Sequence, residues 1–225
     1  MVSSRTTPRA RPAPSTRDRL LAAAAEEFAA RGFDGTKVDR IARRARVNKA
    51  MLYYHFRSKA ALFREIVGAQ FRAVAGAVED VRAAGGAPEA QLRQFAETMA
   101  RQALARPHFA PMWLREIADG GRHVDASVIQ EFRRILGALA AILAEGQQAG
   151  AFRPAHPFVV QMGIVAPLMF FAASAPLRER AGRLLPPVTA TPDLDTVIRY
   201  VQASTLSVLS TTKPHAEPPS RGASR

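Results

Sequence analysis

The chain has 225 residues, a mass of 24.4 kDa, 48% hydrophobic and 23% charged residues, and a formal net charge of +13 at pH 7. These values are typical of a folded protein of one or two domains and exclude a wholly disordered chain. The absence of cysteine excludes disulfides, thiolate metal sites and cysteine nucleophiles.

The positive charge is concentrated near the N-terminus. Residues 1–75 contain 16 Lys and Arg against 6 Asp and Glu, a net +10, whereas residues 76–225 contain 16 against 13, a net +3. This asymmetry favours one domain that contacts phosphates and another that does not. The total charge is weaker evidence, because an excess of Arg also follows from a GC-rich genome.

The first residues form a basic arm rich in proline. Residues 1–15 lack apolar periodicity, so we expect this arm to be disordered in the free protein. Its arginines either reach a minor groove of DNA beside the main contact or belong to an extension without a role. The tail over residues 213–225 has the same character, and disorder is expected there too.

Between these ends helical signals repeat and strand signals are nearly absent. The first helix is expected over residues 17–31, where apolar residues recur at helical spacing. Ser15 or Thr16 can cap its start. Gly32 ends it, because glycine adopts positive φ at little cost.

Two short helices follow, over residues 37–45 and 48–55. Thr36 is predicted to cap the first of them, and Asp39 to complete a capping box. The pair would enclose a small apolar core and leave polar and aromatic side chains exposed on the second helix. A helix-turn-helix that reads the major groove of DNA needs this arrangement.

Longer helices are predicted for the rest of the chain. Ser58 caps a helix over residues 59–83, and glycines and a proline mark a linker after it. Further helices are expected over residues 89–105, 109–118, 124–148, 158–175 and 194–210. The sequence therefore predicts an all-α fold of nine helices without a sheet.

The residues from Phe158 to Leu177 form an apolar stretch of transmembrane length, interrupted by Gln161 and two prolines. A membrane span is one interpretation. We favour a helix buried in a dimer interface, because a lone span would lie between helices of soluble character.

A spaced pattern runs from Gly32 to Phe63. It has an aromatic residue after Gly, a Thr at a helix start, an Ile-Ala pair, a Val before the third helix, then Leu-Tyr-x-His-Phe and x-Ser-Lys-x-x-Leu. The matching residues are Gly32, Phe33, Thr36, Ile41, Ala42, Val47, Leu52, Tyr53, His55, Phe56, Ser58, Lys59 and Leu62. The pattern resembles that of the TetR family of bacterial transcriptional regulators.

The resemblance implies an N-terminal three-helix DNA-binding domain over residues 16–65. A larger helical domain for ligand sensing and dimerisation would occupy residues 66–212. The expected function is that of a cytoplasmic, homodimeric, sequence-specific regulator of transcription. A repressor released from a palindromic operator by a small, largely apolar ligand is the form we expect.

The resemblance also implies which residues contact DNA. Thr36 and Lys37 would contact phosphate at the start of the second helix, where a helix N-terminus attracts anions. The remaining contacts fall to the groove-facing residues Asn48, Lys49, Met51 and Tyr53, and to the backbone-facing residues Tyr54, His55 and Lys59. Asn48 also fits an N-cap, and His55 also fits a packed, hydrogen-bonded residue.

Three positions depart from the family pattern. Arg46 stands where the turn usually has Gly, so it must adopt positive φ or shift the turn. Ala50 and Met51 replace the more usual Gly and Thr, and the operator sequence of a relative therefore does not transfer.

The larger region offers apolar residues for a ligand cavity, and Met-rich walls adapt to varied ligands. The candidates are Phe95, Met99, His108, Phe109, Met112, Trp113, Phe132, Met162 and Met169. Ordinary core packing is the alternative for each. Helices 158–175 and 194–210 would pack against their symmetry mates, as in the family.

Two rival functions fit the sequence less well. An enzyme is not expected, because the chain lacks a Gly-rich phosphate loop, a GxSxG elbow and an HExxH pair. His108, His123 and His156 show no ligand spacing, and neither metal nor cofactor is expected. A nonspecific DNA- or membrane-associated helical protein without ligand sensing would explain the charge but not the motif.

Overall fold

The computed structural model describes residues 14–184 and 192–211. These ranges contain ten helices and no strand, and an isolated bridge joins Phe152 to Ser210. The all-α prediction is confirmed. The basic arm and the tail predicted for residues 1–15 and 213–225 lie outside the described residues, except for residues 14 and 15.

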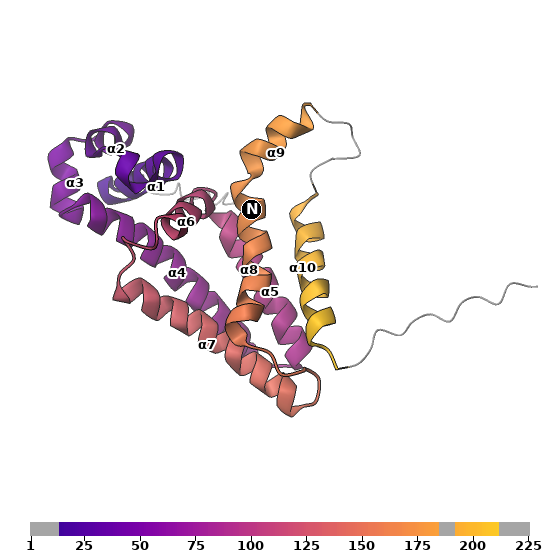
Figure 1. Ribbon diagram of the computed structural model, residues 1–225. Helices are drawn as coiled ribbons and strands as arrows, with labels where there is room; N and C mark the ends of the chain where they lie inside the picture. The colour runs from indigo at the N-terminus through magenta and orange to yellow at the C-terminus, as the bar shows by residue number, and fades with distance from the viewer. Residues whose placement is uncertain (1–13, 185–191, 212–225) are drawn as a thin grey trace, which may run out of the picture.

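Helices α1 (Thr16–Gly35), α2 (Val38–Ala45) and α3 (Lys49–Phe56) gather at one end of the molecule (Figure 1). Ser15 caps α1, as predicted, and its hydroxyl accepts the Asp18 N–H at 3.1 Å. Gly32 has φ 70° and breaks the helical geometry, but helical turns continue to Gly35. The predicted end of this helix is therefore a kink.

Helix α4 (Lys59–Ala84) connects this end to the rest of the molecule (Figure 1). The Ser58 hydroxyl accepts the Ala61 N–H at 3.0 Å, which confirms the predicted cap. The buried residues of α4 belong to one continuous core shared with α1 to α3 and with the later helices. A shift of α4 therefore affects both parts of the molecule.

The larger region is built from helices packed around and beside α4. They are α5 (Pro88–Ala105), α6 (Phe109–Ala118), α7 (Ala126–Gln148), α8 (Pro157–Ala173) and α10 (Leu194–Leu209). Helix α7 runs along α4 (Figure 1), and ion pairs join the two from Arg82 to Glu145 and from Arg134 to Glu79, each at 2.6 Å. Helices α8 and α10 pack side by side.

Helix α9 (Ala175–Gly182) was not predicted, because Pro176 reads as a helix breaker. A proline is tolerated in the first turn, where its missing N–H has no helical partner in any case. The apolar stretch from Phe158 to Leu177 is thus divided between α8 and α9, which are bent by 56°. Within the described ranges no single helix is long and apolar enough to span a membrane, although the bent pair passes by length and composition.

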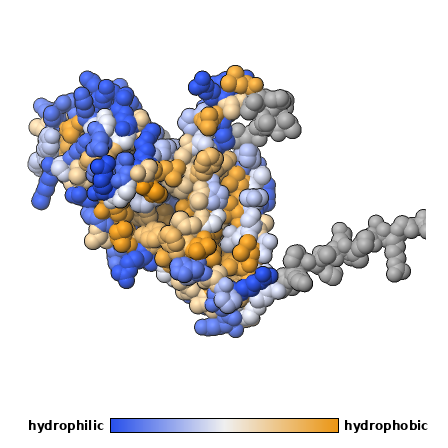
Figure 2. All heavy atoms as spheres, in the orientation of Figure 1, coloured by the Kyte–Doolittle hydropathy of each residue, from blue (hydrophilic) through white to orange (hydrophobic). Residues whose placement is uncertain are grey.

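The surface differs between the two ends of the molecule. Hydrophilic side chains dominate around α1 to α3, whereas apolar side chains gather over the larger region on the same face (Figure 2).

Candidate DNA interface and ligand cavity

The turn between α2 and α3 is closed by Arg46, which lies in the left-handed region with φ 55° and ψ 48°. The predicted positive φ is confirmed. The Val47 N–H donates to the Ala42 carbonyl at 3.0 Å, so the end of α2 is closed as a glycine would close it. A non-glycine residue in this conformation costs about 1 kcal/mol, which the packed core of the motif offsets.

Helix α3 has one buried side and one exposed side. Leu52 and Phe56 are buried against the other helices of the motif. Tyr53 and Tyr54 are 45% and 79% exposed, which leaves both phenol groups accessible on the outer side. Met51 is half-buried. The exposed side suits contact with a groove, since it combines hydrogen-bonding groups with aromatic surface.

Asn48 serves as the N-cap of α3, and its side-chain oxygen accepts the Ala50 N–H at 2.9 Å. The N-cap role that the sequence suggested for this residue is therefore confirmed, and its side-chain oxygen performs it. Its amide nitrogen has no partner among the described residues and keeps its two donors for another group.

Lys49 forms an ion pair with Asp39 of α2 at 2.9 Å, and this hydrogen bond raises the pKa of Lys49. The pair is exposed on both sides. A contact of Lys49 with DNA would require it to exchange this neighbouring carboxylate for a base or phosphate. Exposed pairs of this kind contribute little stability, so the exchange is inexpensive.

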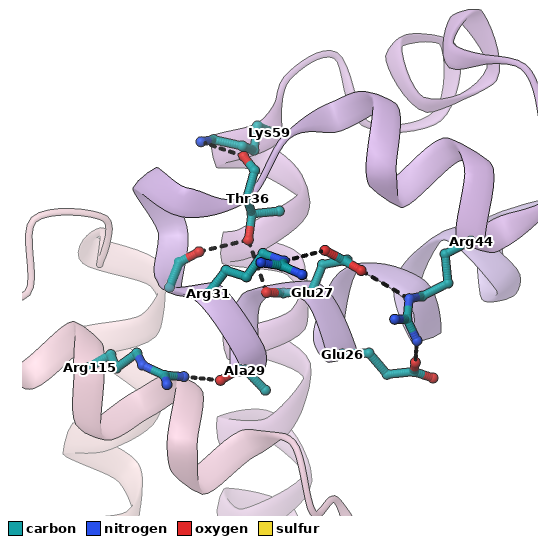
Figure 3. Close-up of polar contacts among 9 residues, drawn as sticks. Glu26, Glu27, Ala29, Arg31, Thr36, Arg44, Lys59 and Arg115 are labelled. Atoms are coloured by element: carbon teal, nitrogen blue, oxygen red, sulfur yellow. Dashed lines mark hydrogen bonds and ion pairs between the residues drawn. The ribbon is translucent and has the colours of Figure 1, made fainter.

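Thr36 does not have the role predicted for it. Its side chain is 1% exposed, and its hydroxyl lies 2.7 Å from the Gly32 carbonyl and 3.0 Å from the Glu27 carbonyl (Figure 3). The N-cap of α2 is Lys37 instead, without a side-chain cap. The predicted capping box is wrong, because Thr36 bonds back to α1. A phosphate contact by its hydroxyl does not fit this geometry.

Lys59 is held by the protein itself. Its ammonium donates to the carbonyls of Phe33 at 2.8 Å and Thr36 at 3.1 Å, and it lies 4.2 Å from the centre of the Phe33 ring. Figure 3 shows it above the link between α1 and α2. These two carbonyls engage two of its three N–H groups. Lys37, by contrast, is exposed at the start of α2.

His55 is half-buried, and its Nε2 atom is enclosed without a hydrogen-bond partner. The ring lies between those of Tyr54 and Phe56, at centroid distances of 5.1 and 6.2 Å. In this conformation the ring is mainly a packing element of α3.

An arginine cluster at the α1–α2 junction was not predicted. Arg31 and Arg44 pair with the buried Glu27, and Arg44 also reaches Glu26 (Figure 3). A polar cleft is lined by Glu27, Arg31, Arg40, Arg43 and Arg44. The recurrence of Arg along α2 is visible in the sequence, but the acidic partners come from another helix.

A cavity of about 180 Å³ lies among α4, α5, α6, α7 and α8. Six of the residues proposed from the sequence line it, namely Met99, Phe109, Trp113, Phe132, Met162 and Met169. Sequence reasoning missed several others, among them Phe71, Leu114, Ile117 and Val165. Leu114 and Ile117 are also 36% and 56% exposed, so they mark where the cavity approaches the surface.

Three proposed lining residues lie elsewhere. Phe95 is fully buried in the core. His108 and Met112 line a different cavity, between α1, α4 and the segment that joins α5 to α6. A helix turns side chains in all directions, and only the packing decides which of them meet a void.

Two buried amides interrupt the apolar wall of the cavity. Gln70 of α4 donates to the Gln102 carbonyl at 3.0 Å and accepts from Arg106, so it is fully engaged. Gln161 of α8 is 2% exposed, and its Oε1 has no hydrogen-bond partner. The lining contains no charged residue.

Helix α6 contacts both the cavity and the N-terminal helices. Trp113 lines the cavity, while the neighbouring Arg115 donates to the Ala29 carbonyl of α1 (Figure 3). One carboxylate oxygen of the buried Glu116 accepts a hydrogen bond from the backbone N–H of His123 at 2.7 Å. Its other oxygen lies 2.9 Å from the ring atom His123 Nδ1. The His123 ring in turn stacks on Phe33 of α1, with 3.7 Å between centroids.

Helices α8 and α10 expose large apolar side chains. On α8, Val159 and Phe170 are 66% and 70% exposed. On α10, Tyr200 and Val208 are 70% and 72% exposed. A two-helix face of this kind is characteristic of a surface that another protein covers.

Two family models match the chain. "Bacterial regulatory proteins, tetR family" matches residues 20–66, and "Tetracyclin repressor-like, C-terminal domain" matches residues 88–181. The HTH-type transcriptional repressor NicS of Pseudomonas putida is 31% identical over 157 residues, which cover 68% of this chain and 73% of that protein. The HTH-type transcriptional repressor SCO4008 of Streptomyces coelicolor is 40% identical over 58 residues, or 30% of its length.

Solved structures share the fold. The ketosteroid transcriptional regulator KstR2 of Mycobacterium tuberculosis superposes with a TM-score of 0.69 at 20% identity, covering 89% of this chain and 98% of that one. The regulator PfmR of Thermus thermophilus superposes with a TM-score of 0.65 at 25% identity, covering 85% and 97%.

Proposed function

Because the chain belongs to the TetR family of bacterial regulatory proteins, we propose that it represses transcription from a palindromic operator until a small apolar molecule releases it. Membership makes the chain a DNA-binding transcription regulator rather than an enzyme. What we propose is that it represses, that its operator is palindromic, that it is a homodimer and that a ligand releases it. The proposal is supported mainly by the position of α6, which lines a cavity and also contacts the DNA-binding helices.

The DNA contact is assigned to the exposed side of α3 and the start of α2. Lys49, Tyr53 and the amide nitrogen of Asn48 face the groove, together with part of Met51. Lys37 and Tyr54 contact the backbone, and Lys59 adds its remaining N–H. His55 acts by packing in this assignment. Bases are read from the groove, while the other contacts set the register.

The homodimer is assigned to α8 and α10. Their exposed apolar side chains would be covered by the same helices of a second copy, which is how a two-fold interface is built. Two copies present two α3 helices. Their half-sites in the operator are then about 34 Å, or one helical turn of DNA, apart.

Release is assigned to the cavity. A ligand there contacts Trp113 and Ile117 of α6 and Phe71 of α4. These two helices reach the DNA-binding helices, through Arg115 in the case of α6 and through the shared core in the case of α4. A ligand that favours one packing over the other changes the separation of the α3 helices and so lowers DNA affinity.

The test begins with selection of binding sites from random duplex DNA. An enriched inverted repeat is expected, and hydrophobic compounds should then lower the affinity of the protein for it. Binding at moderate salt without any sequence preference would favour the nonspecific alternative. If the protein bound a specific site and no compound lowered its affinity for that site, the ligand response would be wrong. The proposed sequence-specific regulator would still stand.

A further inference from the structure

We infer that the ligand is an uncharged, ring-sized molecule that donates one hydrogen bond to the side chain of Gln161. This inference rests on the proposed ligand-sensing function and adds the chemical class of the ligand. The deciding observation is that Gln161 lines the cavity while its Oε1 has no hydrogen-bond partner.

A buried acceptor without a partner is costly to the protein alone. Such groups are rare in folded proteins, and leaving one unpaired costs about 1–3 kcal/mol. Gln70, the other amide in the wall, is satisfied on both its atoms. The two amides therefore differ, since Gln70 holds α4 to the end of α5 whereas Gln161 keeps an unused acceptor. The oxygen is enclosed in this conformation, so a ligand reaches it after rotation about the last torsion of the side chain, which is broad for an amide.

The rest of the wall defines the remaining chemistry. It is apolar and contains Phe71, Phe109, Trp113 and Phe132. Since no charged residue lines it, an ionised ligand would be buried without a counter-charge. A volume of about 180 Å³ fits a single substituted ring, because an apolar cavity of about 150 Å³ holds benzene. The expected class is a phenol, a cyclic alcohol or a ring with one N–H.

The test compares phenol with toluene, which have the same shape and differ in a hydroxyl for a methyl group. Benzaldehyde serves as a ring of similar size that only accepts hydrogen bonds. Trp113 is the only tryptophan of the chain and lines the cavity, so its fluorescence reports binding directly. For phenol and toluene it is excited at the red edge of its absorption, where these two probes do not absorb. Benzaldehyde absorbs in that range, so its Kd is measured by isothermal titration calorimetry.

Gln161→Met is the informative variant, because it keeps the length of the side chain and removes the amide. The ratio of the phenol Kd to the toluene Kd should rise about tenfold in this variant, whereas the benzaldehyde to toluene ratio should not change. Using ratios removes the different hydrophobicities of the probes. Gln161→Leu provides a second apolar replacement if the methionine fills the cavity.

Met162→Leu is the matched control, since Met162 also lines the cavity and has no hydrogen-bonding group of comparable strength. It should change the Kd of phenol and toluene by the same factor. An unchanged phenol to toluene ratio in both Gln161 variants, a selective loss of benzaldehyde, or no binding of any probe to the wild type would each overturn the inference. The proposed function fails separately, if bound probes leave operator affinity unaltered.

Discussion

At the scale of single residues, Lys59 combines two tasks that one substitution removes together. Its ammonium bonds to two carbonyls at the α1–α2 junction and lies over the Phe33 ring. Lys59→Ala should lower the free energy of unfolding by about 1.5–3 kcal/mol, as expected for hydrogen bonds from a charged group. It should also weaken binding to all DNA. Urea denaturation and DNA titration measure the two effects.

Lys37 provides the matched comparison, because it is exposed and its side chain caps nothing. Lys37→Ala should leave stability unchanged and weaken specific and unrelated duplexes alike. The slope of log affinity against log salt should become shallower by about one unit, since one phosphate contact is lost. Equal stability in both variants would contradict the structural role of Lys59.

Tyr53 and Lys49 should behave differently from these phosphate contacts. Both lie on the exposed side of α3, where they face the groove in the proposed complex. Tyr53→Phe or Lys49→Ala should change the preference among operator variants more than the average affinity, by about 1–3 kcal/mol at the affected base. Competition binding with single-base operator variants measures this. A uniform loss across all variants would remove both residues from base reading.

Gln161→Met should also be more stable than the wild type. Removing a buried acceptor that has no partner, and replacing it with apolar volume, should raise the free energy of unfolding by about 1 kcal/mol. Chemical denaturation of the ligand-free protein measures it. Gln70→Met should have the opposite sign, because Gln70 is hydrogen-bonded on both atoms. A destabilised Gln161 variant would imply that this amide has a structural partner.

Local conformation could be predicted from the sequence better than the contacts that each side chain makes. The positive φ at Arg46 followed from the position of the turn. The hydrogen bonds of Thr36 and Lys59 could not be predicted, because their partners are carbonyls of α1 that only the tertiary fold brings near. The same holds for Gln161, whose missing partner is a property of the packed wall and not of the local sequence.

At the scale of elements, α6 is one of the two helices that join the cavity to the DNA-binding helices, and α4 is the other. Arg115→Ala removes the bond from α6 to the Ala29 carbonyl while leaving Trp113 and the cavity wall in place. Probe binding should persist, and the factor by which the probe lowers operator affinity should fall toward one, because the coupling free energy is reduced. Trp113 fluorescence and operator titration measure the two quantities.

Arg122→Ala is the control for this variant. Arg122 also reaches α1, but through an exposed pair with Asp34 at 3.7 Å, which contributes little. It should leave the coupling factor unchanged. If both variants kept full coupling, the coupling would run through other contacts, either α4 or the His123 ring that Glu116 holds against Phe33 of α1.

Helix positions were the best predicted feature at this scale. Caps at Ser15 and Ser58 and breaks at Gly or Pro are local signals, so most predicted bounds lie within two residues of the observed ones. The exceptions have local reasons of their own. Gly32 kinks α1 without ending it, and Pro176 begins α9 where a proline suggested only a break.

At the scale of the whole molecule, the apolar face of α8 and α10 should hold two copies together. The sequence indicated its composition, but the exposure of Phe170 and Tyr200 emerges only once the helices are packed. The boundary proposed at residues 65 and 66 lies inside α4, so DNA-binding and sensing regions are not mechanically separate. The proposed dimerisation, operator binding and ligand response would therefore depend on one continuous core.

Phe170→Glu tests the proposed dimer interface on α8 and α10. A carboxylate buried in an apolar interface without a partner costs several kcal/mol, so the variant should be monomeric at concentrations where the wild type is dimeric. Its affinity for the full palindrome should fall to that for a single half-site, because the second α3 no longer binds in the same event. Light scattering and titration of full and half operators measure both.

Ile129→Glu is the control, because Ile129 is 51% exposed on α7, and this variant should remain dimeric. A Phe170 variant that stays dimeric and keeps palindrome affinity would place the interface elsewhere on the molecule.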